Sequence, residues 1–153
     1  MALDHGAIGR TREGGTLLVT RSRLRLFALA TGQQDPVFTD LDAARAAGHP
    51  DLPVPPTFCF GVDLEVREPF GYLTDLGVDL RAVLHGEQEF THHRTAHAGD
   101  ELTSSPVITD VYAKKGGALT FLVSESPVVD QDGRPVVTLR NTLVVRRLPG
   151  VAA

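Results

Sequence analysis

The sequence is poor in cysteine and in long apolar runs. Its 153 residues include one cysteine, Cys59, so an internal disulfide is excluded and a reducing compartment is favoured. Residues 1–10 contain no apolar core of signal-peptide length, and no run of about 18 apolar residues that could span a bilayer occurs. We therefore expect a cytoplasmic protein that does not cross a membrane.

The sequence also has no excess of basic residues. The 15 Lys and Arg residues are outnumbered by 19 Asp and Glu residues, which gives a formal net charge of -4. Nucleic acids and anionic membranes attract proteins with a basic face, so neither is expected as a partner. A small ligand or another protein fits better. The length predicts a single domain over residues 1–153, with a polar leader at 1–14.

The first third of the chain predicts one strand and two helices. Residues 16–20 form a short β-prone run that ends at Thr20, a residue able to cap a helix. Apolar residues then recur at helical spacing over 22–31, and Gly32 supplies a left-handed stop. A second, shorter helix is expected over 40–47.

The segment 51–64 begins with prolines and then becomes apolar on nearly every side. Proline is well tolerated in a first helical turn, so a helix starting near Pro56 is expected. A helix that is apolar all round must be buried. Residues 66–83 show no clear period, which predicts a loop with at most a turn of helix.

The second half of the chain alternates with a period of two, which is typical of strands. The expected strands lie near 84–93, 101–114, 118–129 and 135–147. Pro106 has no amide donor, so the strand that contains it should bulge or lie at an edge there. One early strand, two helices and an antiparallel meander together predict an α+β fold.

Several short motifs resemble the MaoC family of dehydratases. The loop after the first helix keeps the family's Thr31, Gly32, Pro36, Asp40 and Ala44. Further matches are Pro55-Pro56-Thr57-Phe58, His85-Gly86-Glu87-Gln88 and Ala98-Gly99-Asp100. The order of these motifs is similar to the N-terminal type of MaoC domain. The resemblance implies a hot-dog fold, in which a curved antiparallel sheet wraps a central helix. The core contacts that it implies for this helix are Phe58, Phe60, Val62 and Leu64.

The resemblance also implies an acyl-thioester ligand, carried by coenzyme A or acyl carrier protein, and a (3R)-hydroxyacyl dehydratase or enoyl hydratase system. The chain differs from the family at the catalytic positions. The family's catalytic Asp falls on Gln33, its Asn on Asp35 and its catalytic His on Phe38. Gln33 and Phe38 cannot exchange protons at neutral pH, so the usual acid and base are absent.

Two other residues are candidates for proton transfer. Asp35 lies on the same loop, two residues late, so it could act only if the loop repositions it, and the sequence favours a role in capping the loop or a turn. His85 is expected to share a strand face with Glu87 and Glu89, so a His–carboxylate pair could act as acid or base. The alternative is a polar strand face at a subunit contact.

Substrate-binding candidates lie on both motifs. In the loop they are Gly32, Gln33 and Phe38. At the start of the proposed buried helix they are Pro56, Thr57 and Phe58, because the free amides of Thr57 and Phe58 could hold a thioester carbonyl oxygen. Simple helix initiation is the competing interpretation.

The remaining histidines and carboxylates bear on other possible sites and functions. His92, His93 and His97 do not predict a metal site, because adjacent strand residues point to opposite faces, and neither a metal nor an organic cofactor is expected. Asp63 and Glu65 leave a hot-dog thioesterase open as an alternative. A third possibility is a non-catalytic subunit. An open sheet edge predicts a homodimer, or a heterodimer with a MaoC subunit that holds the intact Asp and His.

Overall fold

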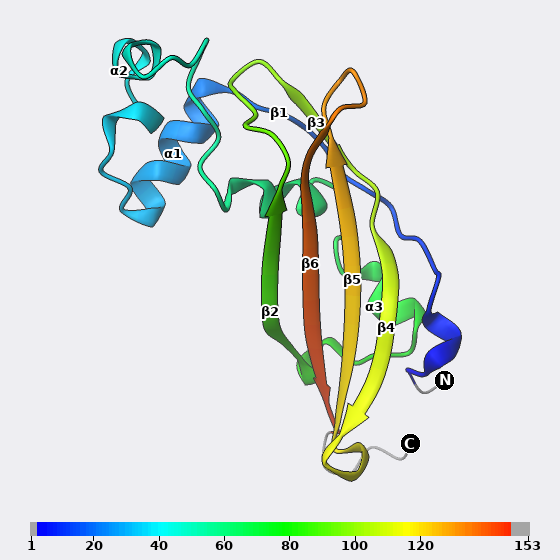
Figure 1. Cartoon of the computed structure of the whole chain (residues 1–153). Helices are drawn as coiled ribbons and strands as arrows, with labels where there is room; N and C mark the ends of the chain where they lie inside the picture. The colour runs from blue at the N-terminus through cyan, green and yellow to red at the C-terminus, as the bar shows by residue number, and fades with distance from the viewer. Residues whose placement is uncertain (1–2, 148–153) are drawn as a thin grey trace.

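The computed structural model describes residues 3–147 and shows a curved antiparallel sheet with short helices packed around it (Figure 1). The strands are β1 (Thr16–Leu18), β2 (Val83–His92), β3 (Glu101–Ser104), β4 (Val107–Lys114), β5 (Leu119–Val129) and β6 (Pro135–Arg146). The α-helices are α1 (Arg21–Thr31), α2 (Leu41–Ala46) and α3 (Gly71–Asp75). The 3-10 helices are η1 (His5–Ala7), η2 (Pro36–Phe38), η3 (Phe58–Leu64), η4 (Leu80–Ala82) and η5 (Lys115–Gly117). Within residues 3–147 no helix is long and apolar enough to cross a membrane.

The sheet has six strands in the order β1-β3-β5-β6-β2, with β4 also paired to β5. Every pairing is antiparallel, as the alternating pattern predicts. The strand expected over 101–114 is two strands, because the chain is interrupted at Ser105 and Pro106. The sequence predicted a bulge or an edge position at Pro106, whereas the structure shows a break, for the same physical reason that proline cannot donate to the ladder.

The first third of the chain follows the sequence prediction closely. The Thr20 hydroxyl caps α1 by accepting from the Arg23 amide, and Gly32 ends the helix with a φ of 69°. The Asp40 carboxylate caps α2 by accepting from the Ala43 amide. In Figure 1 α1 and α2 lie together beyond one end of the long strands, while α3 lies behind the sheet near the middle of β4 and β5.

The central helix differs from the prediction. It is the seven-residue 3-10 helix η3, and it is not buried all round. Phe58 and Val62 pack into the core as expected, whereas Phe60 is 36% exposed and Leu64 is 38% exposed. Its hidden face includes Asp63, which is only 7% exposed. Burial repeats every four residues along the segment, so it has two faces, and the apolar residues of the less buried face line a cavity.

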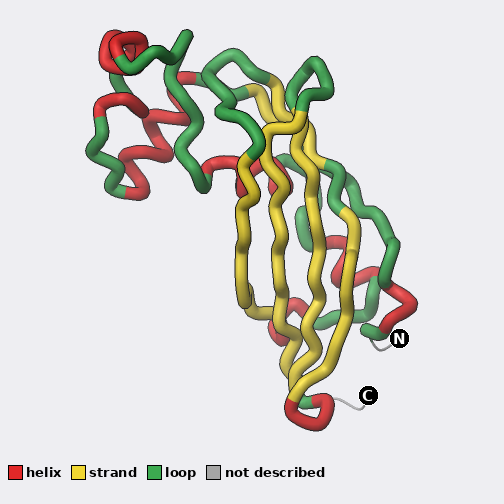
Figure 2. Tube along the Cα trace, viewed as in Figure 1, coloured by secondary structure: helices red, strands yellow, loops and turns green. Residues whose placement is uncertain are grey.

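Residues 66–83 form α3 and η4 and build a second core. Leu73 and Val78 pack there against Ile108 and Leu122 of the sheet. Ala7 of the leader joins this core and is 3% exposed. The leader is therefore packed against the sheet, although its composition suggested a polar extension. Figure 2 shows these helical segments on one side of the strands (Figure 2).

Candidate functional site

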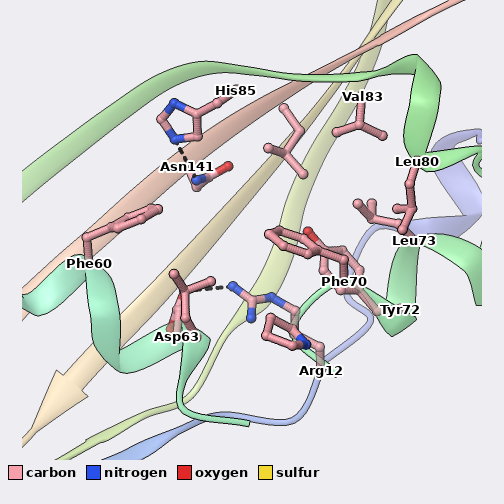
Figure 3. Close-up of a pocket in the computed structure, with 13 residues that line it drawn as sticks. Arg12, Phe60, Asp63, Phe70, Tyr72, Leu73, Leu80, Val83, His85 and Asn141 are labelled. Atoms are coloured by element: carbon pink, nitrogen blue, oxygen red, sulfur yellow. Dashed lines mark hydrogen bonds and ion pairs between the residues drawn. The ribbon is translucent and has the colours of Figure 1, made fainter. Parts of the chain in front are cut away.

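A cavity of about 450 Å³ lies between η3, α3 and the neighbouring ends of β2 and β6 (Figure 3). Most of its lining is apolar: Phe60, Leu64, Pro69, Phe70, Leu73, Leu80, Val83 and Leu143. The polar side chains in the lining are Arg12, Asp63, Tyr72, His85 and Asn141. An apolar cavity of this size with a few polar groups is typical of a small-molecule site.

An ion pair forms one polar end of this cavity. The Arg12 guanidinium donates to Asp63 Oδ2 at 2.6 Å, and the Ser126 hydroxyl donates to the same oxygen at 2.7 Å. Buried charges need such partners, since an unpaired charge is expensive to desolvate. The guanidinium also lies 5.1 Å from the centre of the Tyr72 ring. Burial raises the pKa of Tyr72 above its ordinary value.

His85 and Asn141 form a second polar group. The Asn141 amide nitrogen lies 3.1 Å from His85 Nε2 and donates to Gln88 Oε1 at 2.9 Å. The ring of Phe60 meets the His85 ring edge-on, with 5.9 Å between the centroids. His85 therefore lies in the cavity with an amide beside it.

The predicted pairing of His85 with Glu87 is wrong. The register of β2 against β6 shifts between His85 and Glu87, which is the mark of a β-bulge at Gly86. The extra residue turns His85 to the face of Gln88 and leaves Glu89 to pair with Arg140. A Cβ on Gly86 would lie 2.9 Å from the Thr142 carbonyl oxygen, so the close approach of the strands favours glycine here.

The loop residues of the family motif lie away from this cavity. Gly32, Gln33, Asp35 and Phe38 are not among its lining residues. The exposed Asp35 carboxylate accepts from the Val37 amide at 3.0 Å, which is the turn-capping role. The Gln33 side chain accepts from the Asp35 amide at 3.1 Å. In Figure 1 this loop lies with α1 and α2 beyond one end of the sheet, away from α3.

The start of η3 also differs from the expected oxyanion site. The Phe58 amide is not free, because it donates to the Pro55 carbonyl at 3.0 Å. The chain forms a tight turn there in place of a first α-helical turn. The Phe58 ring is buried and packs edge-on against Phe27 with centroids 5.4 Å apart, whereas Thr57 is exposed. Pro56 lines a second cavity of about 320 Å³.

The histidine and carboxylate side chains within residues 3–147 do not cluster as metal ligands. Among residues 3–147 no group of three or more His, Cys, Asp or Glu side chains is placed to hold a metal ion. Glu65 is paired with Arg23 at the surface, and Asp63 is held by Arg12 and Ser126. Asp63 is thus placed as a hydrogen-bond acceptor in the cavity wall.

Comparison with known proteins identifies the family. The family model for the FAS1-like dehydratase domain region matches residues 6–139. The chain belongs to this family. A UPF0336 protein of Leifsonia xyli subsp. xyli is 43% identical over 129 residues, which cover 84% of this chain and 85% of the relative.

Solved structures give the fold of this FAS1-like dehydratase domain. A chain of the C-terminally truncated HadBC (3R-hydroxyacyl-ACP dehydratase) complex from Mycobacterium tuberculosis matches with a TM-score of 0.75 at 24% identity, over 92% of this chain and 99% of that one. A MaoC-like dehydratase matches with a TM-score of 0.77 at 25% identity, over 92% of this chain and 42% of that one. The fold is the hot-dog fold of MaoC-like dehydratases, which confirms the sequence resemblance.

Sequence reasoning missed three polar residues of the cavity in this dehydratase domain. Arg12 lies in the polar leader and Tyr72 lies in the segment 66–83, and neither stretch has a pattern that indicates a site. Asn141 did carry a signal, because it interrupts the apolar alternation of Val137, Leu139 and Leu143 on the core-facing side of β6. A polar residue in such a series indicates a partner or a cavity.

Proposed function

We propose that this chain is the acyl-thioester-binding subunit of a hydratase or dehydratase that acts on 2-enoyl and (3R)-hydroxyacyl thioesters, and that a homologous partner chain supplies the acid and the base. The single observation that carries the proposal is the apolar cavity between η3 and the sheet. Burying each methylene of an acyl chain there is worth about 0.8 kcal/mol.

The geometry of the motif loop supports a subunit that lacks a catalytic acid and base of its own. Hydration of an enoyl thioester needs one group to accept a proton from water and another to donate one at the α-carbon. At the motif positions stand Gln33 and Phe38, and the nearby Asp35 is engaged in capping η2. His85 reaches the cavity, but its neighbour there is the Asn141 amide.

A partner has a natural place to bind. β2 is an edge strand that pairs only with β6 among the described strands, and most of its ten residues are exposed. An open edge of this length offers unpaired backbone groups to another chain. Val83 and His85 of β2 line the cavity, so a subunit bound along β2 would border the ligand. The HadBC complex, whose chain has the same fold, is itself an assembly of different subunits.

The test is turnover of crotonyl-CoA and longer enoyl-CoA esters by the purified chain, alone and co-expressed with a MaoC-type chain of the same genome that carries the Asp and His of the motif. We expect the chain alone to be at least about a hundredfold slower than the complex, the scale of acid–base catalysis. Asp35→Asn should leave the activity of the complex unchanged. Rapid turnover by the chain alone that Asp35→Asn or His85→Ala abolishes would contradict the proposal.

A further inference from the structure

Arg12 and Tyr72 lie between the apolar cavity and a second cavity of about 230 Å³. Both residues line both cavities, and Pro69 does so as well. The second cavity is more polar, because its lining includes three carboxylate side chains, Glu13, Glu68 and Asp75. A ligand chain that fills the apolar cavity therefore meets Arg12 and Tyr72 before it reaches this charged side.

Contacts from three segments hold these two side chains in place. The Arg12 guanidinium, in the leader, donates to Asp63 of η3 at 2.6 Å and lies 5.1 Å from the centre of the Tyr72 ring. A guanidinium is attracted to the face of an aromatic ring. Tyr72 belongs to α3, and the next residue, Leu73, is fully buried in the second core. Because Asp63 anchors Arg12 and Leu73 anchors α3, neither side chain is free to swing away from the other.

Arg12 and Tyr72 lie on the side of the cavity away from β2. Thr11, the neighbour of Arg12, forms an antiparallel bridge with Val107 of β4. β4 pairs with β5, β5 with β6 and β6 with β2, so β4 and β2 are three strand spacings apart, about 14 Å. Figure 3 shows Arg12 and Tyr72 across the cavity from His85 of β2 (Figure 3). A ligand that enters along β2 has its far end at Arg12 and Tyr72.

The direction of the acyl chain follows from the place of the partner. In the proposed function the partner binds along β2 and supplies the acid and the base, so the thioester lies near β2 and the acyl end points away from it. We propose that Arg12 and Tyr72 are the end wall of the acyl cavity, and that the Tyr72 ring sets the longest acyl chain that the cavity encloses. This limit rests on the proposed function, because it names the chain length that the same site takes. A longer chain gains little beyond the wall, since the hydrophobic gain requires apolar surroundings and the second cavity presents carboxylates.

The first experiment measures binding to the unaltered chain as a function of acyl length. Titration calorimetry would use saturated acyl-CoA esters from butanoyl-CoA to eicosanoyl-CoA, at concentrations below those at which they form micelles. We expect Kd to fall by about fifteenfold for each pair of methylenes that the cavity buries, and then to level off or rise at the length that reaches Tyr72. If the esters bind and Kd shows no such break, the wall is refuted while the proposed function stands. If no ester binds, the proposed function fails with it.

Substitutions at Tyr72 then assign the break to its ring. Tyr72→Ala removes the ring and should move the break to longer esters, and Tyr72→Leu, which loses less volume, should move it in the same direction with a smaller cost to folding. Tyr72→Phe keeps the ring and should keep the break. A break that stays in place in both Tyr72→Ala and Tyr72→Leu, with circular dichroism showing that one of them is folded, would overturn the assignment.

The matched control is the other tyrosine of the chain. Tyr112 stacks on Phe121 with 4.9 Å between the ring centroids, and it lines neither of the two cavities. Tyr112→Ala therefore removes the same side chain from the same fold without opening the proposed wall, and it should leave the break unchanged. A break that moves equally in Tyr112→Ala and Tyr72→Ala would show a general loosening of the fold and would also overturn the assignment.

Discussion

Val83→Trp is expected to weaken the binding of a long-chain acyl-CoA by about a hundredfold. Val83 is half-buried at the start of β2 and lines the cavity. An indole there would occupy the space of roughly three or four methylenes of the ligand. At about 0.8 kcal/mol for each methylene, the loss is roughly 3 kcal/mol, or two orders of magnitude in Kd. Titration calorimetry with palmitoyl-CoA measures the change.

The control for this substitution places the same side chain on α1. Leu29 is 80% exposed, and the helix lies beyond the end of the sheet away from α3, as Figure 1 shows. Leu29→Trp should leave Kd unchanged. The natural chain has no tryptophan, so fluorescence reports whether each introduced indole is enclosed. Equal affinity in both variants would mean that the acyl chain lies elsewhere.

Gly15→Ala is expected to lower the free energy of unfolding by about 2 kcal/mol or more. A Cβ at position 15 would lie 1.9 Å from the Val62 carbonyl oxygen, which is backbone and cannot move aside alone. Gly15 also donates its amide to the Ser104 hydroxyl at 3.0 Å, so the strand cannot shift freely. Overpacking of this kind typically costs 1–3 kcal/mol, and chemical denaturation measures it.

Gly61→Ala is the matched control, because it is a second glycine on the same side of the fold. Nothing lies within 4 Å of the Cβ that it would gain, and its φ is not in the left-handed region. Alanine should be neutral there or slightly stabilising, since glycine is the poorer helix former. If Gly15→Ala were as stable as Gly61→Ala, the close contact between η3 and the segment before β1 would be disproved.

The parts of the fold that follow from local signals could be predicted. Helix caps and stops depend on the chemistry of single residues. Thr20 and Asp40 cap helices and Gly32 ends one, as their residue types favour. The strands of the second half follow from alternation, and Pro106 marks the break between β3 and β4. The hot-dog fold then followed from the order of these elements and the motifs.

The candidate site was harder to predict because it depends on tertiary contacts. The bulge at Gly86 changes which residues His85 faces, and a strict period of two cannot show an inserted residue. The pairing of Arg12 with Asp63 joins residues 51 positions apart, so no local pattern could reveal it. The two faces of η3 were also hidden, because an uninterrupted apolar run does not show which residues meet the sheet and which meet a cavity.

The central claim is that the acyl chain of a thioester lies between η3 and the sheet. Photolabelling tests it most directly, with an acyl-CoA that carries a diazirine near the end of its chain and mass spectrometry to find the modified residues. The account predicts labelling of the cavity wall at Phe60, Leu73 or Leu143. Labelling confined to the loop at residues 32–38 would contradict it.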